Sequence, residues 1–141
     1  MKSNSEIVDY LKSFYPKNAI TSCKTPERKK ERFEKEWKIG RSGLTQADYR
    51  EYKFIPVVTG RDKSPPPGHV EIFSGSAYFF MTREFVQWTL ESEEVRELIE
   101  WSKDTFSPDE FVWATIVRNK NAPGNNFYYE VRFETTRIIS F

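Results

Sequence analysis

Residues 73–90 read FSGSAYFFMTREFVQWTL and carry the strongest secondary-structure signal of the chain. The small residues at 73–76 predict a turn, and the continuous apolar run Ala77–Met81 predicts a buried strand. Thr82 is placed to cap a following helix, and Ser92 to cap a second one. Buried strands that alternate with helices are typical of layered α/β proteins, so we expect an α/β fold class.

Residues 104–118, DTFSPDEFVWATIVR, contain a further helix signal and the first candidate for chemistry. Ser107, Pro108 and Glu110 stand in the order of a capping box, with a hydroxyl, a proline and a glutamate at the N-cap, first and third positions. In that interpretation the Ser107 oxygen accepts from the N–H of Glu110, and the carboxylate reaches back to Ser107. The apolar run Phe111–Val117 then predicts a buried helix. Glu110 is therefore either a helix cap or a catalytic base.

The rest of the chain predicts elements with weaker signals. Three prolines in GRDKSPPPGH, residues 60–69, indicate a stiff surface loop without regular structure. The other expected elements are a capped helix from Ser3 toward Pro16, an extended piece at 19–22, a charged helix over 25–38, a strand over Tyr52–Val58, and a turn at 121–126.

Composition limits the classes of function. A chain of 141 residues is expected to form a single domain, residues 1–141, with a core of its own. The net charge of +1 argues against a general nucleic-acid-binding surface or a membrane-binding field. The aromatic content of 16% indicates a buried aromatic cluster, a sugar-stacking surface, or both. Cys23 is the single cysteine, which excludes an internal disulfide.

Most catalytic and targeting signatures are absent from the sequence. It has no phosphate-binding glycine loop, no G-x-S-x-G, no H-E-x-x-H and no Asp-x-Asp pair, so we expect no metal site. His69 is the single histidine and is expected to be structural or solvent-facing. The polar start lacks an apolar run for a signal peptide or membrane anchor. We expect either a cytosolic protein or a piece whose targeting segment lies elsewhere.

The spellings Gly-Ser-Ala-Tyr-Phe, Arg-Glu-Phe-Val, Ser-Pro-Asp-Glu and Trp-Ala-Thr occur in this order between residues 75 and 115. In this pattern the chain resembles the core-2/I-branching β-1,6-N-acetylglucosaminyltransferases. The resemblance implies a partial Rossmann-like glycosyltransferase A-type fold, with a mixed sheet and flanking helices. It also implies inverting, metal-independent transfer of N-acetylglucosamine from UDP-N-acetylglucosamine to a 6-hydroxyl of galactose or N-acetylgalactosamine on glycoprotein O-glycans, at the lumenal side of the Golgi membrane in a type II membrane protein.

The same resemblance assigns roles to particular residues. It makes Glu110 the catalytic base, and it makes Lys29 and Arg32 contacts to the acceptor sugar, although a solvated charged helix is the alternative for that pair. Gly75 and Ser76 are candidate substrate-binding residues, because a glycine lets the backbone approach a ligand; a tight turn is the alternative. A family acceptor-binding glutamate falls near residues 21–22, which are Thr and Ser here.

The end of the chain departs from the family pattern. In YYEVRFETTRIISF, residues 128–141, only Arg132-Phe133 looks like the family's Arg-Phe. The family's donor-site residues, including the basic residues that hold the diphosphate, match positions before Lys2 and beyond Phe141. We therefore expect an internal fragment with acceptor-side machinery and weak or no transferase activity alone. A non-catalytic carbohydrate-binding or pseudoenzyme fragment and a peptide xylosyltransferase sibling remain alternatives.

Overall fold

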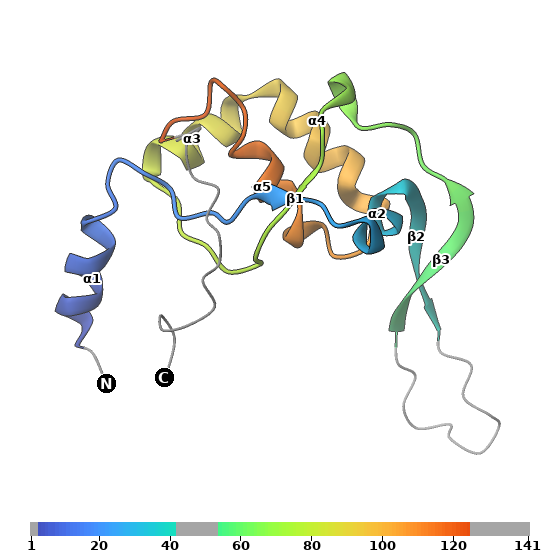
Figure 1. Ribbon diagram of the computed structural model, residues 1–141, viewed down its shortest axis with the longest axis horizontal. Coiled ribbons are helices and arrows are strands. Elements are labelled where there is room, and N and C mark those ends of the chain that lie inside the picture. Colours follow the sequence, from blue (N-terminus) through green and yellow to red (C-terminus); the bar gives the residue numbers. More distant parts are fainter. Residues whose placement is uncertain (1–2, 42–53, 125–141) are drawn as a thin grey trace, which may run out of the picture.

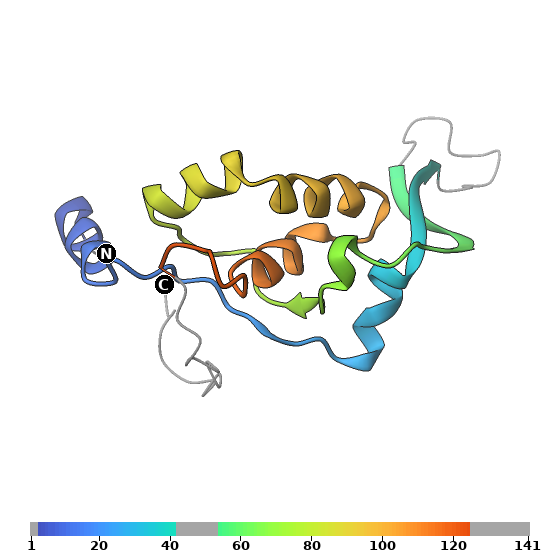
Figure 2. The same ribbon diagram turned by 90° about the horizontal axis from the view of Figure 1, so that it is seen from above.

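The computed structural model describes residues 3–41 and 54–124 of the chain, and these form a central body with a projection at each end (Figures 1 and 2). Helix α1 stands off one end, and the β2–β3 hairpin extends from the other. The elements in chain order are α1 (Asn4–Lys12), β1 (Cys23–Lys24), α2 (Glu27–Glu34), β2 (Lys35–Arg41), β3 (Phe54–Asp62), η1 (Pro67–His69), β4 (Phe73–Ser74), α3 (Arg83–Glu91), α4 (Glu93–Trp101), η2 (Ser102–Asp104), η3 (Pro108–Glu110) and α5 (Val112–Ile116).

Two small antiparallel sheets make up the β-structure of the described residues. Strand β1 pairs with β4, so that Cys23 lies opposite Ser74. Strand β2 pairs with β3, with a register shift between Lys35 and Trp37. The described part of the chain is therefore mixed α/β, as the sequence predicts.

The predicted buried strand over Ala77–Met81 is wrong. Only an isolated bridge between Ala19 and Phe80 forms there. The neighbouring phenylalanines pack on different partners: the Phe80 ring lies 4.9 Å from that of Phe14, and the Phe79 ring 5.6 Å from that of Trp113. Phe79, Phe80 and Met81 are half-buried in an irregular segment, whereas Ala77 and Tyr78 are exposed. A continuous hydrophobic pattern does not distinguish such a segment from a buried strand.

The helices α3 and α4 confirm the capping predictions. The Thr82 hydroxyl accepts from the N–H of Phe85 at 3.2 Å, and the Ser92 hydroxyl from the N–H of Val95 at 3.4 Å. Their inner faces meet α5 in the main hydrophobic core, where Phe85 is fully buried. The core residues are Ile72, Phe85, Val95, Leu98, Phe111, Val112, Ile116 and Ala122.

The charged helix predicted over 25–38 is wrong in its second half, because α2 ends at Glu34 and residues 35–41 form β2. Lys35 pairs with Asp62 across the hairpin instead of supporting a helix. The Trp37 ring packs against that of Phe106 with centroids 4.9 Å apart. Pairing with β3 and this ring contact are tertiary interactions, and they outweigh a weak helix preference at the end of a short element.

The remaining predictions are mixed in outcome. Helix α1 carries the predicted capping box between Ser3 and Glu6 and ends before Pro16. Strand β3 begins at Phe54 and extends into the predicted loop 60–69, where η1 adds a single turn of 3-10 helix. Residues 52–53, residues 125–126 of the predicted turn and the tail 128–141 lie outside the described residues. None of the helices in the described ranges is long and apolar enough to cross a bilayer.

Candidate functional site

Glu110 lies in η3, which is one turn of 3-10 helix, and the capping box predicted for Glu110 is absent. Ser107 has φ 51° and ψ 61°, the left-handed conformation, and its side chain makes no cap hydrogen bond. The N–H of Glu110 donates instead to the backbone oxygen of Ser107 at 3.1 Å. A capping serine needs an extended backbone, so the left-handed Ser107 cannot cap the turn. The carboxylate of Glu110 therefore takes no part in capping this turn.

The Glu110 carboxylate meets two cations that project from α2. Its Oε2 accepts from Lys29 Nζ and from Arg32 Nη1, both at 2.8 Å. Lys29 and Arg32 are three residues apart and therefore share one face of the helix. The side chains of Glu110, Lys29 and Arg32 are 33%, 22% and 27% exposed, so solvent still reaches the group. The three residues together are called the Glu110 triad below.

The two cations make Glu110 a stable anion. The hydrogen bond from Lys29 is the largest effect that lowers the pKa of Glu110 below its usual value, partial burial opposes it, and Arg32 lowers the pKa further. Both cations use Oε2, so Oε1 accepts no hydrogen bond from any residue in the described ranges. An ionised carboxylate with one oxygen held and one available can accept a proton from a bound hydroxyl group.

The start of α2 is held against β4 by buried hydroxyl groups. Thr25 Oγ1 donates to the carbonyl of Ile72 at 2.7 Å, and Ser74 Oγ donates to Thr25 Oγ1 at 3.0 Å. Thr25 therefore tethers the chain next to the helix rather than capping it, and Pro26 occupies the N-cap position without a side-chain bond. These contacts fix the position of the start of α2, and with it Lys29, relative to β4.

Gly75 lies directly beside the backbone of the Glu110 turn. Its N–H donates to the carbonyl oxygen of Glu110 at 2.7 Å. A Cβ atom at Gly75 would lie 2.0 Å from the carbonyl oxygen of Thr21 and 3.0 Å from the Cβ of Ala114. Glycine is required here because the chain passes so close to Thr21 and Ala114. The hydrogen bond from Gly75 to Glu110 is a separate contact, and it ties the FSGS segment to η3.

Ser76 is not part of the Glu110 triad. Its hydroxyl accepts from the N–H of Tyr78 at 3.0 Å and makes no hydrogen bond to Glu110, Lys29 or Arg32. The structure therefore brings together four of the five sequence-predicted site residues, which are Glu110, Lys29, Arg32 and, through its backbone, Gly75.

Sequence reasoning did not identify Arg118, which organises the segment where the family's acceptor glutamate was expected. Its guanidinium donates through Nε to Ser22 Oγ at 2.8 Å and lies 4.5 Å from the ring centroid of Phe73. Ser22 is buried and donates to the carbonyl of Ala114 at 2.7 Å. The Ser22 side chain is thus used in structural contacts with Ala114 and Arg118. No motif in the sequence indicated that Arg118, after the end of α5, makes these contacts.

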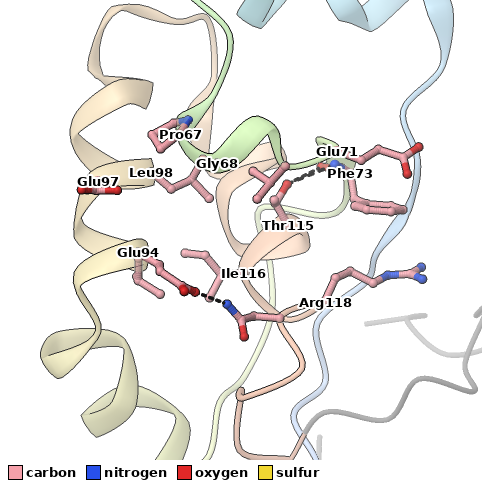
Figure 3. A pocket seen from close by; sticks show the side chains of 13 residues that line it. Pro67, Gly68, Glu71, Phe73, Glu94, Glu97, Leu98, Thr115, Ile116 and Arg118 are labelled. Carbon is pink, nitrogen blue, oxygen red and sulfur yellow. Dashed lines mark hydrogen bonds between the residues drawn. The ribbon is translucent and has the colours of Figure 1, made fainter.

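A cavity of about 420 Å³ opens between η1, α4 and the end of α5 (Figure 3). Its apolar wall includes Leu98 and Ile116, and Glu94 at its side is hydrogen-bonded to Asn119 at 2.8 Å. The Thr115 hydroxyl accepts from the N–H of Phe73 at 3.0 Å beside it. None of the sequence-predicted site residues lines this cavity, so it is separate from the Glu110 triad.

The described residues contain no group of three or more His, Cys, Asp or Glu side chains that could hold a metal ion. His69 is exposed, with a left-handed backbone at φ 53° after Gly68.

The family model for the Core-2/I-Branching enzyme matches residues 1–133. A bovine beta-1,3-galactosyl-O-glycosyl-glycoprotein beta-1,6-N-acetylglucosaminyltransferase is 38% identical over 125 residues, which cover 89% of this chain and 26% of the relative. Mouse enzyme 4 of the same name is 40% identical over 124 residues, covering 88% and 26% respectively. The chain therefore spans about a quarter of the length of these relatives.

Proposed function

The chain belongs to the core-2/I-branching enzyme family, and from this premise we propose that it supplies the catalytic base and acceptor-binding part of an inverting glycosyltransferase. The reaction proposed is transfer of N-acetylglucosamine from UDP-N-acetylglucosamine to the 6-hydroxyl of a galactose or N-acetylgalactosamine residue on a glycoprotein O-glycan. The relatives carry names that state a β-1,6-N-acetylglucosaminyltransferase activity on β-1,3-galactosyl-O-glycosyl glycoproteins.

The observation that carries the proposal is the Glu110 triad. In the proposed reaction Oε1 of Glu110 accepts the proton of the acceptor hydroxyl while that oxygen forms a bond to the anomeric carbon of the donor. The bond between the anomeric carbon and the diphosphate oxygen breaks, and UDP leaves with the electron pair. A single displacement inverts the anomeric configuration and needs no second carboxylate as a nucleophile.

Lys29 and Arg32 have two roles in this proposal. In the free protein they keep Glu110 ionised. When the acceptor binds, their N–H groups donate hydrogen bonds to hydroxyl groups of the sugar. A cation that exchanges Glu110 for a sugar hydroxyl no longer stabilises the carboxylate as strongly, so the pKa of Glu110 rises. Glu110 would then become a stronger base at the moment when the acceptor is in place.

Several parts of the proposal concern a complete enzyme of this family rather than the 141 residues alone. They are a Rossmann-like glycosyltransferase A-type fold, a donor site in which basic residues rather than a metal ion neutralise the diphosphate, and a location at the lumenal side of the Golgi membrane. The family membership supports each of them, and the small antiparallel sheets of the described residues are compatible with a part of such a fold.

Exchange of the matched segment tests the proposed chemistry. The segment of the bovine relative that this chain matches is replaced by this chain, and release of UDP is measured with a Galβ1-3GalNAc acceptor. We expect turnover with UDP-N-acetylglucosamine and none with UDP-xylose. Glu110→Gln should lower kcat by about a hundredfold or more, whereas Asp109→Asn, at the exposed neighbouring position, should leave it unchanged.

The 141-residue chain gives an independent measurement. Titration with the Galβ1-3GalNAc disaccharide should move the side-chain NMR signals of Glu110, Lys29 and Arg32 together. Turnover that survives Glu110→Gln would remove Glu110 from the chemistry, and turnover with UDP-xylose would indicate a peptide xylosyltransferase. Acceptor binding by the 141-residue chain combined with an inactive, folded hybrid would indicate a non-catalytic carbohydrate-binding module.

A further inference from the structure

Phe106 precedes the SPDE sequence and makes three contacts with the α2–β2 segment. Its N–H donates to the carbonyl oxygen of Arg32 at 2.8 Å. The Arg32 guanidinium carbon lies 5.1 Å from the centroid of the Phe106 ring. The same ring packs against the ring of Trp37, with centroids 4.9 Å apart. Phe106 thus holds both the backbone and the charged end of Arg32.

We propose that Phe106 is a positioning residue that fixes the Arg32 guanidinium against the Glu110 carboxylate, an inference that rests on the function proposed for Glu110. Phe106 does not touch the reacting groups itself. It acts through Arg32, whose Nη1 donates to Glu110 Oε2 at 2.8 Å.

The ring of Phe106 is not explained by packing in the main core. The core cluster and the partly buried residues around it contain neither Phe106 nor Trp37. Phe106 is only half-buried, and its ring instead contacts a guanidinium group and an indole. A guanidinium group over an aromatic face is attracted by the ring quadrupole and loses rotamer freedom. Such a contact orients the Arg32 side chain more than it adds to core burial.

The backbone at Phe106 links the segment that carries Glu110 to the helix that carries Arg32. Among the described residues, its hydrogen bond to Arg32 is the one backbone bond that joins α2 to the segment 102–111. Ser107, the next residue, is left-handed, and its carbonyl oxygen accepts from the N–H of Glu110. Because Arg32 and Glu110 are 78 residues apart in sequence, their separation depends on such a local link between the two segments.

The charge environment of Glu110 makes this positioning measurable. The groups that lower its pKa are Lys29 and Arg32, both from α2. If Arg32 loses its support, its hydrogen bond to Glu110 weakens while Lys29 stays in place. The pKa of Glu110 should then rise toward its usual value.

The test uses the 141-residue chain with ¹³C-labelled glutamate and follows the Glu110 carboxyl signal by NMR as the pH is lowered. Phe106→Leu should raise the pKa of Glu110, and Phe106→Tyr, which keeps the aromatic face, should restore it to that of the unmodified chain. Phe33→Leu is the matched control, because Phe33 lies beside Arg32 in α2 but packs on Phe111, with ring centroids 5.6 Å apart. It should leave the pKa of Glu110 unchanged.

An unchanged pKa in Phe106→Leu, or an equal rise in Phe33→Leu, would overturn the inference. Phe106→Met takes the place of Phe106→Leu if the latter does not fold by circular dichroism. In the active hybrid protein, kcat/KM should fall about ten- to a hundredfold in Phe106→Leu and recover in Phe106→Tyr. Turnover that survives Glu110→Gln would instead remove the proposed function and leave the effect of Phe106 on Glu110 standing, so the two failures are distinguishable.

Discussion

Lys29 Nζ and Glu110 Oε2 lie 2.8 Å apart, although 81 residues separate them in the chain. Lys29 emerges from α2, which is anchored through Thr25 to Ile72, and Glu110 from η3, which is anchored through its carbonyl to Gly75. Ile72 and Gly75 flank the same short strand, β4. Strand β4 and its flanking residues are therefore the common support that brings Glu110 and Lys29 together.

Removal of the Lys29 charge should raise the pKa of Glu110, because the hydrogen bond from Lys29 is the largest effect that lowers it. Lys29→Met keeps the aliphatic stem and removes the ammonium group. Lys30→Met is the matched control, since Lys30 is the next residue of α2 and pairs with Glu27 at 2.7 Å. Titration of the Glu110 carboxyl signal by NMR should show a rise in the first variant only. An equal pKa in both variants would contradict the role given to Lys29.

Glu110 should contribute to stability at neutral pH and lose that contribution in acid. Its pKa is lower in the folded protein than in the unfolded chain, so the contribution is present above the unfolded value of about 4.3. It disappears as the pH falls through the folded pKa. At pH 7 Glu110→Gln should lower the free energy of unfolding by less than about 1 kcal/mol, because solvent screens a partly exposed pair. Urea unfolding at a series of pH values should show this difference shrinking below pH ~4, and a difference that grows in acid would contradict the prediction.

Gly75→Ala should destabilise the fold around the Glu110 turn. The new methyl group would lie 2.0 Å from the carbonyl oxygen of Thr21, which is backbone and cannot rotate away. We expect the free energy of unfolding to fall by about 1–3 kcal/mol in urea denaturation. Ser76→Ala, at the next position, loses only the bond from the Tyr78 N–H and should cost below about 1 kcal/mol. Equal losses in the two variants would mean that the backbone approach at Gly75 is not required.

Ser107→Ala should have little effect on stability, because the Ser107 hydroxyl caps nothing. Thr82→Ala is the matched comparison, since the Thr82 hydroxyl accepts from the N–H of Phe85, and its removal should cost about 1 kcal/mol. Ser107→Gly should stabilise the chain slightly or leave it unchanged, because glycine adopts the left-handed conformation without strain. Thermal unfolding of the three variants tests this order. A loss in Ser107→Ala as large as that in Thr82→Ala would restore the capping interpretation.

The helices α3 and α4 could be predicted because their signals are local. Each cap is a hydroxyl three residues before the N–H that it accepts from, so Thr82 and Ser92 carry the information within a single turn. The same local rule failed at Ser107, where the residue order of a capping box is present but the backbone is left-handed. Phe106 and Glu110, on either side of Ser107, both contact Arg32 of α2, which lies far away in the chain, and such distant contacts are not visible in a local residue order.

The sequence alone determined the family, the positions of the capped helices and the identity of Glu110, Lys29 and Arg32 as the residues to consider, because motifs and caps are read from neighbouring letters. Only the tertiary structure decided that the Glu110 side chain caps no helix and that residues 77–81 form no strand. It also decided that both Lys29 and Arg32 donate to Oε2 of Glu110. The convergence on Oε2 depends on contacts between segments about 80 residues apart, and the packing of residues 79–80 depends on Phe14, Ala19 and Trp113. Many weak interactions compete over such distances in the chain, and no short pattern records which of them prevails.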